Sequence, residues 1–337
     1  MPVDYHANPE INQGLLQHFG LKEGDYSAMY ERLGIDFRMV SAPYVGPKLH
    51  AVYGDRKVDE WGIRRRWVEH GTGGYWDYCD WPLVDATVEQ IEAWPMPSPD
   101  HFDYSALAQQ CRELGQYAIV AGNPGIGCAI NTNGMLRGME QALIDLVTDD
   151  PAGLRLLDRR FEVELSVMER TLDAAAGGCD ILWMGEDLGT QIGPMISPEV
   201  YRRHIRPRHQ AFVDLGKSRG VKVMVHTCGS SSWAYEDFIE MGVDVVDTLQ
   251  PEATDMSPGY LKEHFGGRLA FHGCISTAGP VAYGGVEDVV EDVRRTLEVM
   301  MPGGGYSLSP THSLQSNSPI ANVVAMYEAA HTLGRYR

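Results

Sequence analysis

The feature that most restricts the fold of this chain is a repeated alternation of short apolar runs and helical stretches, which starts near residue 117. Such alternation predicts parallel strands, each followed by a helix that covers the sheet. From residue 35 to the end we expect about seven strands, with room for one more between residues 43 and 105. The expected strands are 35–40, 118–122, 181–184, 222–228, 243–246, 269–272 and 306–308.

Capping residues mark several of the intervening helices. Residues 8–33 have a helical pattern that ends near Gly34. Over 150–178, an Asp-Pro pair begins the helix, a Gly-Gly pair ends it, and apolar residues recur three or four positions apart. The stretch 197–220 begins with Ser-Pro, and we expect its helix to bend near Pro207 because proline lacks an amide N–H.

Two architectures fit this alternation, an eight-stranded α/β barrel and a doubly wound sheet. No expected strand is followed by the glycine fingerprint of a dinucleotide site, which weakens the second. In a TIM barrel the active site lies at the carboxyl ends of the strands. The polar residues at or just after the carboxyl ends of the expected strands are Asn123, Glu186, Asp187, His226, Cys228, Asp247, Gln250, Cys274 and His312. We therefore predict a (β/α)8 TIM barrel whose functional site lies at the mouth that these ends form.

Composition and charge exclude several classes of function. The formal net charge of −18 is unfavourable for binding nucleic acid or an anionic membrane surface. No apolar run is long enough for a membrane span, and the first residues lack a signal-peptide pattern, so we expect a cytoplasmic protein. The six cysteines are scattered through a long chain, which argues against a disulfide framework.

The segment from about 43 to 105 differs from the rest. It contains five of the seven tryptophans and three closely spaced prolines, and its patterns indicate short strands and loops. One interpretation is an aromatic-rich packing layer, and the other is a cap over the barrel mouth that contacts and selects a substrate. We expect one TIM-barrel domain over 1–337, with this segment as its cap or insertion.

The stretch 222–229 contains the most informative pair of residues. In a strand, residues two apart point to the same face, so His226 and Cys228 are expected side by side at the strand end. An imidazole and a thiolate form half of a zinc site. The candidates for a third ligand, all at other strand ends, are His312, Cys274, Glu186, Asp187 and His272.

Two other interpretations of the pair stay open. Cys228 is a buried cysteine beside a hydrogen-bonded histidine in one, and a nucleophile activated by His226 in the other. Glu186 and Asp187 are candidate acid–base residues, although Asp187 is also suited to capping a loop or pairing with an arginine. Candidate substrate contacts are Tyr44, Asn123, Gln191, Asp247, Gln250 and Cys274, some of which are also suited to orienting the histidines or to ordinary packing.

At these residues the chain resembles the uroporphyrinogen decarboxylase superfamily over most of 100–337. The resemblance rests on Leu-Arg-Gly-Met-Glu at 136–140, Gly-Glu-Asp-Leu-Gly-Thr-Gln at 185–191, the helix from 197 to 207, and Val-His-Thr-Cys-Gly at 225–229, together with Pro-Thr-His at 310–312 and the helix that carries Asn322. The resemblance implies an (α/β)8 barrel. The superfamily includes the heme-pathway decarboxylase and zinc-dependent, corrinoid-linked methyltransferases.

Two departures separate these branches. The decarboxylase carries an arginine-rich Arg-Gln-Ala-Gly-Arg-Tyr motif for substrate carboxylates, and the counterpart here, 38–43, lacks it. The methyltransferases carry a His-x-Cys pair and a later cysteine in Pro-x-Cys as zinc ligands. His226 and Cys228 match the pair, and His312 stands in place of the later cysteine. The resemblance thus implies Zn²⁺ held by His226, Cys228 and His312.

The leading hypothesis is a methyltransferase, or demethylase, that moves a methyl group between a methylated small molecule and a corrinoid carried by a partner protein. Zinc would polarise the heteroatom of the substrate, with Glu186 or Asp187 as proton donor or further ligand. The alternatives are a decarboxylase of a non-porphyrin acid and a non-catalytic ligand-binding barrel. Large barrels often dimerise, so a homodimer is also an option.

Overall fold

The computed structural model describes residues 1–71 and 73–336, and it has the predicted α/β fold of TIM-barrel type. Among these residues, seven strands form one sheet in the order β1-β5-β6-β7-β8-β9-β10. All seven lie where the sequence predicted a strand, within a few residues. Their bounds are β1 Phe37–Val40, β5 Ala118–Gly122, β6 Ile181–Gly185, β7 Lys222–Thr227, β8 Val245–Thr248, β9 Ala270–Ile275 and β10 Tyr306–Pro310.

The strands are buried along nearly their whole length. In β6 only the first residue is partly exposed, and β9 shows the same pattern. The pairs β5–β6, β6–β7, β8–β9 and β9–β10 are parallel. Parallel strands with both faces covered require continuous apolar runs rather than alternation, which explains why these strands were recognisable from the sequence.

Helices occupy the connections, and their N-caps agree with the sequence signals. Asp150 accepts hydrogen bonds from the amides of Ala152 and Gly153 at the start of the longest helix. The main helices are α1 Pro9–His18, α2 Tyr26–Leu33, α4 Leu107–Glu113, α5 Ile130–Arg137, α6 Met139–Thr148, α7 Pro151–Ala174, α9 Arg206–Ser218, α10 Tyr235–Met241, α11 Pro258–Phe265, α13 Val286–Met300 and α14 Ile320–Leu333. Shorter helical segments are α3 Val88–Ala93, η1 Pro99–His101, α8 Pro198–Val200, η3 Ser232–Ala234 and α12 Pro280–Tyr283.

Two expected helices are interrupted. The single helix expected over 8–33 is two, α1 and α2, because Gly20 and Gly24 in the connection both adopt positive φ. The bend expected near Pro207 is a π-helical segment, η2 Tyr201–Ile205, directly before α9. A proline that cannot donate an amide hydrogen bond is a common cause of such local distortion.

The chain divides into two compact units, which are described separately. The first unit contains 1–37, 188–194 and 227–337, and the second contains 38–187 and 195–226. The expectation of one domain over 1–337 stays a prediction.

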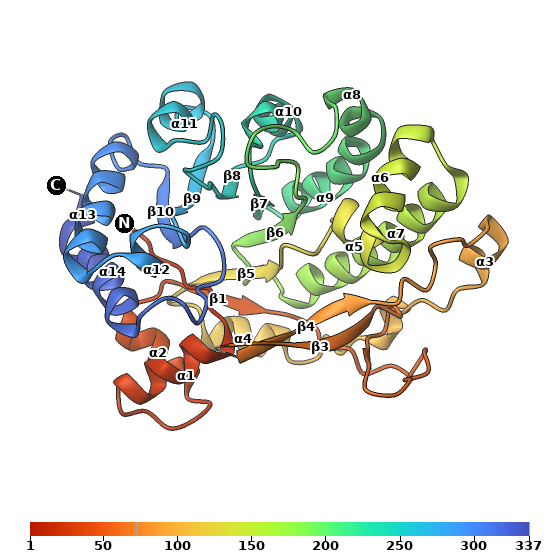
Figure 1. Ribbon diagram of the computed structural model, residues 1–337, viewed down its shortest axis with the longest axis horizontal. Coiled ribbons are helices and arrows are strands. Elements are labelled where there is room, and N and C mark those ends of the chain that lie inside the picture. The colour runs from red at the N-terminus through yellow and green to blue at the C-terminus, as the bar shows by residue number, and fades with distance from the viewer. Residues whose placement is uncertain (72, 337) are drawn as a thin grey trace. The chain divides into compact units, whose positions relative to one another are not determined.

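The second unit contains most of the segment from 43 to 105. Its strands β2 Lys57–Val58, β3 Arg64–His70 and β4 Gly73–Cys79 form an antiparallel sheet, whose β3–β4 hairpin is orange in Figure 1. A buried apolar cluster joins this segment to α5 and α7, and Trp61 and Trp94 pack against it. Its members are Ile63, Leu83, Ile91, Leu136, Ala152 and Leu156. The aromatic packing expected here is therefore present.

In the first unit, the N-terminal segment pairs with β10. Val3 forms a parallel bridge with Leu308, and Ala7 forms one with Leu314 beyond the strand. On the other side, the carbonyl of Val3 accepts from the amide of Asp36. Helices α13 and α14 pack against each other near β10 (Figure 1). The extra strand that the sequence left room for between 43 and 105 is not part of the seven-stranded sheet, because β2, β3 and β4 form a separate antiparallel sheet.

No helix among the described residues combines the length and the apolar character that crossing a membrane requires.

Candidate metal centre

The carboxyl ends of β6 and β7 bring the candidate ligands together. Gly185 is in register with His226, and the amide of Glu186 donates a 2.9 Å hydrogen bond to the carbonyl of His226. The strand β6 therefore ends beside the imidazole-bearing residue of β7. The two carboxylates that follow β6 leave the sheet at this point.

Asp187 faces His226. Its Oδ1 lies 3.8 Å from His226 Nε2, and its Oδ2 accepts a 2.6 Å hydrogen bond from the side-chain Nδ2 of Asn131. Cys228 follows His226 by two residues and lies just beyond β7, which ends at Thr227. One ligand atom from each of Asp187, His226 and Cys228 lies within 4.8 Å of the other two. The group offers a carboxylate oxygen, an imidazole nitrogen and a thiolate, all of which bind zinc.

The loop after Cys228 requires glycine. Gly229 has a φ of +70°, and a Cβ added there would lie 2.3 Å from the carbonyl oxygen of Gly189. Its amide donates a 2.6 Å hydrogen bond to the side chain of Gln250. Gln250, predicted to contact a substrate, thus holds the loop that follows Cys228.

Glu186 is fully buried and has three hydrogen-bond donors around it. Its carboxylate accepts from the amides of Ala129 and Ile130, at the start of α5, and from the thiol of Cys128. Burial raises the pKa of Glu186 to about 8, against the opposing effect of the two amide hydrogen bonds. Its contacts fix the β6 end against α5, whereas Asp187 faces the metal group. The acid–base role of either residue stays a prediction.

Two other ligand candidates lie in the first unit. His312 follows β10, is exposed, and has its Nδ1 3.4 Å from the carbonyl of Ser313. The group formed by Asp187, His226 and Cys228 does not include it, so its role as a zinc ligand stays a prediction. Cys274 is buried in β9 with a positive φ, and burial raises the pKa of its thiol well above the usual range.

The other residues predicted to contact a substrate have hydrogen-bond or ion-pair partners within the protein. The hydroxyl of Tyr44 donates to the carbonyl of Pro47, and the side chain of Asn123 accepts from the amide of Gly125. Gln191 is exposed, and its carbonyl accepts from the amide of Thr254. Asp247 pairs with His272 at 2.6 Å and so belongs to a different cluster. Substrate contact by these residues is untested.

A cavity of about 400 Å³ lies in the second unit. Its lining includes Asn123 at the end of β5, Trp61 from the aromatic segment, and Arg160 with Glu164 from α7. Arg160 Nη2 donates to Glu164 at 2.7 Å, and its guanidinium lies 5.1 Å from the centre of the Trp61 ring. Arg160 is only 2% exposed, yet its Nε and Nη1 have no hydrogen-bond partner among the described residues.

This buried pair was not among the site residues predicted from the sequence. Arg160 and Glu164 are four residues apart, on the face of α7 that also buries Leu157, Phe161 and Met168. Charged residues spaced this way within an apolar stripe break the amphipathic pattern, and that break was a usable signal.

Known families and solved structures include some that this chain resembles. The family model described as Uroporphyrinogen decarboxylase (URO-D) matches residues 80–333. A solved methyltransferase from Methanosarcina mazei is 16% identical, with a TM-score of 0.67 over 99% of this chain and 94% of that chain. D-psicose 3-epimerase from Clostridium cellulolyticum H10 is 11% identical, with a TM-score of 0.44 over 93% of each chain. No curated protein matches the chain.

Proposed function

The chain belongs to the uroporphyrinogen decarboxylase family, and from that premise we propose that it is a zinc-dependent methyltransferase. In this proposal, a methyl group moves between a methylated small molecule and a corrinoid carried by a partner protein. The solved protein whose fold covers nearly the whole chain is also named a methyltransferase, at 16% identity.

The observation that carries the proposal is the donor group at the carboxyl ends of β6 and β7. Asp187, His226 and Cys228 present three ligand atoms within 4.8 Å of one another, from three chemically different side chains. Catalytic zinc sites use three protein ligands and keep a fourth position open for water or substrate. His312 is the further ligand that the superfamily pattern proposes.

Each ligand has a defined support. Asn131 orients the carboxylate of Asp187, and the Glu186 amide ties the β6 end to His226. Gly229 and Gln250 fix the turn that follows Cys228. When bound, zinc would act as a Lewis acid on the heteroatom that carries the methyl group. The protein groups hold the ligands in place so that little reorganisation accompanies binding.

The cavity in the second unit is the proposed place for the part of a small substrate that does not contact the metal, since none of the three ligands lines it. Its volume of about 400 Å³ is in the range of small-molecule pockets. Asn123 is the predicted substrate contact that lines it, and Trp61 supplies an aromatic wall.

Metal content tests the proposal. Full-length protein, purified under zinc-replete conditions, is compared with His226→Ala, Cys228→Ser and His312→Ala by elemental analysis. Cys79→Ser, which removes a buried thiol at the end of β4, is the matched control. The proposal expects Cys228→Ser and His226→Ala each to lower zinc by about one ion per chain. Equal zinc in the wild type and both variants would overturn it.

Activity then tests the methyl transfer. The protein is mixed with reduced cobalamin and a panel of methyl ethers, methylamines and methyl thioethers, and methylcobalamin is followed by its absorbance. We expect formation of methylcobalamin with one class of substrate and its loss in Cys228→Ser. A zinc-loaded protein that transfers no methyl group in either direction would contradict the methyltransferase assignment.

One observation favours decarboxylation of an organic acid as a second candidate function. Arg160 presents two guanidinium nitrogens beside the cavity that have no hydrogen-bond partner in the part of the chain that the structure describes, and a carboxylate is the natural acceptor for such a pair. Release of CO₂ from aromatic or aliphatic acids, reduced in Arg160→Gln and unchanged in Cys228→Ser, would favour this function over methyl transfer.

A further inference from the structure

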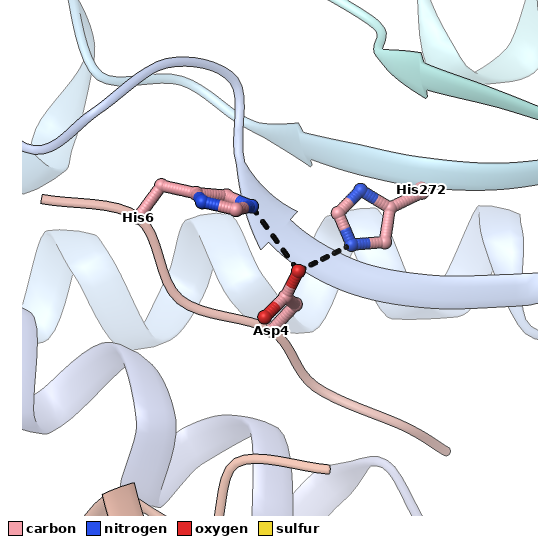
Figure 2. A group of neighbouring side chains, drawn as sticks. All are labelled: Asp4, His6 and His272. Atoms are coloured by element: carbon pink, nitrogen blue, oxygen red, sulfur yellow. Dashed lines mark hydrogen bonds and ion pairs between the residues drawn. The ribbon is translucent and has the colours of Figure 1, made fainter. Parts of the chain in front are cut away.

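A second group of metal-ligating side chains lies in the first unit. Figure 2 shows Asp4 between His6 and His272. Asp4 Oδ2 lies 3.1 Å from His6 Nε2 and 3.2 Å from His272 Nε2. One ligand atom from each of the three residues lies within 4.8 Å of the other two. Two imidazoles and one carboxylate form a recurrent ligand set for divalent transition metals.

The backbone gives two of these ligands one orientation. Asp4 and His6 are two residues apart in the extended segment that pairs with β10, and in extended backbone such residues share a face. The amide of Asp4 donates to the carbonyl of Leu308, and the amide of Leu314 donates to the carbonyl of His6. Both residues are therefore held by backbone pairing and not only by their side chains.

The third ligand, His272, is oriented by a carboxylate on its other ring nitrogen. His272 in β9 is in register with Asp247 in β8, and its Nδ1 lies 2.6 Å from Asp247 Oδ1. A carboxylate on Nδ1 holds a proton there, which leaves Nε2, the nitrogen that faces Asp4, as the atom available to a metal ion. Many metal-binding histidines have such a carboxylate behind the ring. This arrangement gives Asp247 a function that substrate contact does not require.

Burial and charge favour a cation at this point. His272 is fully buried and Asp4 nearly so, and two carboxylates, Asp4 and Asp247, flank the ring. The side chain of His6 is 27% exposed, although its Nε2 is buried, so His6 is the member of the group nearest to solvent.

We propose that Asp4, His6 and His272 bind a divalent transition-metal ion through one carboxylate oxygen and two imidazole nitrogens, with Asp247 as the positioning residue of His272. This site contains no sulfur ligand, unlike the group at the end of β7. It suits ions that accept nitrogen and oxygen donors, such as Mn²⁺, Fe²⁺, Co²⁺ and Zn²⁺. The two sites share no residue, so each is testable without the other.

Cobalt substitution separates the two sites. Full-length, metal-free protein is titrated with Co²⁺, and bound cobalt is measured by equilibrium dialysis together with the absorption spectrum. A thiolate ligand gives an intense sulfur-to-cobalt charge-transfer band, whereas nitrogen and oxygen ligands give only weak d–d bands. In Cys228→Ser, which lacks the thiolate, we expect about one bound Co²⁺ without the charge-transfer band.

Removing the proposed ligands tests the assignment. In the Cys228→Ser background, His6→Gln is expected to weaken cobalt binding at least about tenfold, and Asp247→Asn by about 10–100-fold. His6→Gln is the informative variant, since a partly exposed residue is less critical for folding than Asp4 or His272. His264→Gln, which replaces an exposed histidine on α11, is the control and should bind cobalt normally.

Two results would overturn the proposal. One is a Cys228→Ser protein, folded by circular dichroism, that binds no cobalt at concentrations that saturate the wild type. The other is cobalt binding in Cys228→Ser that His6→Gln and Asp247→Asn leave unchanged. Either result can occur whether or not zinc binds His226 and Cys228, so failure here leaves the proposed methyltransferase site to its own test.

Discussion

Asp187 Oδ1 lies 3.8 Å from Nε2 of His226. His226 lies in β7, in register with Gly185, the last residue of β6. This relationship makes a carboxylate the third neighbour of the His-x-Cys pair. Asn131 holds the other oxygen of Asp187 at 2.6 Å and leaves Oδ1 directed at the imidazole.

Asp187→Asn is expected to weaken zinc binding at least about tenfold, because an amide is a much poorer zinc ligand than a carboxylate. Zinc affinity is measured by competition with a chromophoric chelator. Asp173→Asn, an exposed carboxylate on α7 that pairs with Arg219, is the control. Unchanged affinity in Asp187→Asn together with a loss in His312→Ala would instead assign the third position to His312.

Gly229→Ala is expected to destabilise the protein more than Gly220→Ala. Both glycines have a left-handed φ, +70° and +73°, so each alanine carries a backbone penalty of about 1–2 kcal/mol. A Cβ at Gly220 meets nothing within 4 Å, whereas one at Gly229 lies 2.3 Å from the carbonyl oxygen of Gly189. Urea denaturation should show at least about 1 kcal/mol of additional loss for Gly229→Ala. Equal losses of unfolding free energy would mean that the loops near Cys228 shift to accommodate the added methyl group without cost.

Asp145→Asn is expected to lower the free energy of unfolding by about 3–5 kcal/mol. Asp145 and Arg137 form a two-point ion pair in which both side chains are less than 5% exposed, so the substitution leaves the buried guanidinium with only the more distant carboxylate of Asp150, 3.5 Å away. Asp214→Asn, on the exposed face of α9, should change stability by less than about 0.5 kcal/mol. Matching denaturation midpoints for the two variants would contradict the prediction.

Stability should fall with acidification because of His209. Burial lowers the pKa of this fully buried imidazole from 6.5 to about 4, and the hydrogen bond to the Gly127 carbonyl only partly opposes that effect. The unfolded chain therefore binds this proton first, and stability is lost as the pH falls from about 6.5 to about 4. The shift corresponds to roughly 3 kcal/mol.

His209→Gln removes this titration, so its unfolding free energy should decline less steeply across the same pH window, even if the variant is less stable overall. The comparison uses chemical denaturation at several pH values between 4 and 7. Parallel curves for the wild type and the variant would show that His209 contributes nothing to the acid sensitivity.

Much of the fold was predictable because its physical basis is local. Strands such as β6 and β9 are continuous apolar runs, and α7 begins with an Asp-Pro cap whose hydrogen bonds the structure contains. The pairing of His226 with Cys228 followed from the two-residue period of a strand. Gly20 and Gly24, which divide the first helical stretch, were visible in the sequence but were outweighed by the helical pattern around them.

The site features that were not predicted from the sequence depend on tertiary contacts, or on the two-residue period of extended backbone, which was applied only to segments with apolar runs. Asp4 and His6 have the same two-residue spacing as His226 and Cys228, but no apolar run marks their segment as a strand. Only pairing with β10 makes that segment extended. The partnership of Asp247 with His272 required the register between β8 and β9, which no single-sequence pattern specifies. Arg160 required knowledge of which face of α7 is buried.

The most direct test of the central claim is X-ray absorption at the zinc edge of protein loaded with one equivalent of zinc. If His226 and Cys228 bind the metal, the spectrum of the wild type contains one sulfur neighbour at about 2.3 Å, and Cys228→Ser loses it. A wild-type spectrum with only nitrogen and oxygen neighbours, identical to that of Cys228→Ser, would contradict the proposed zinc centre.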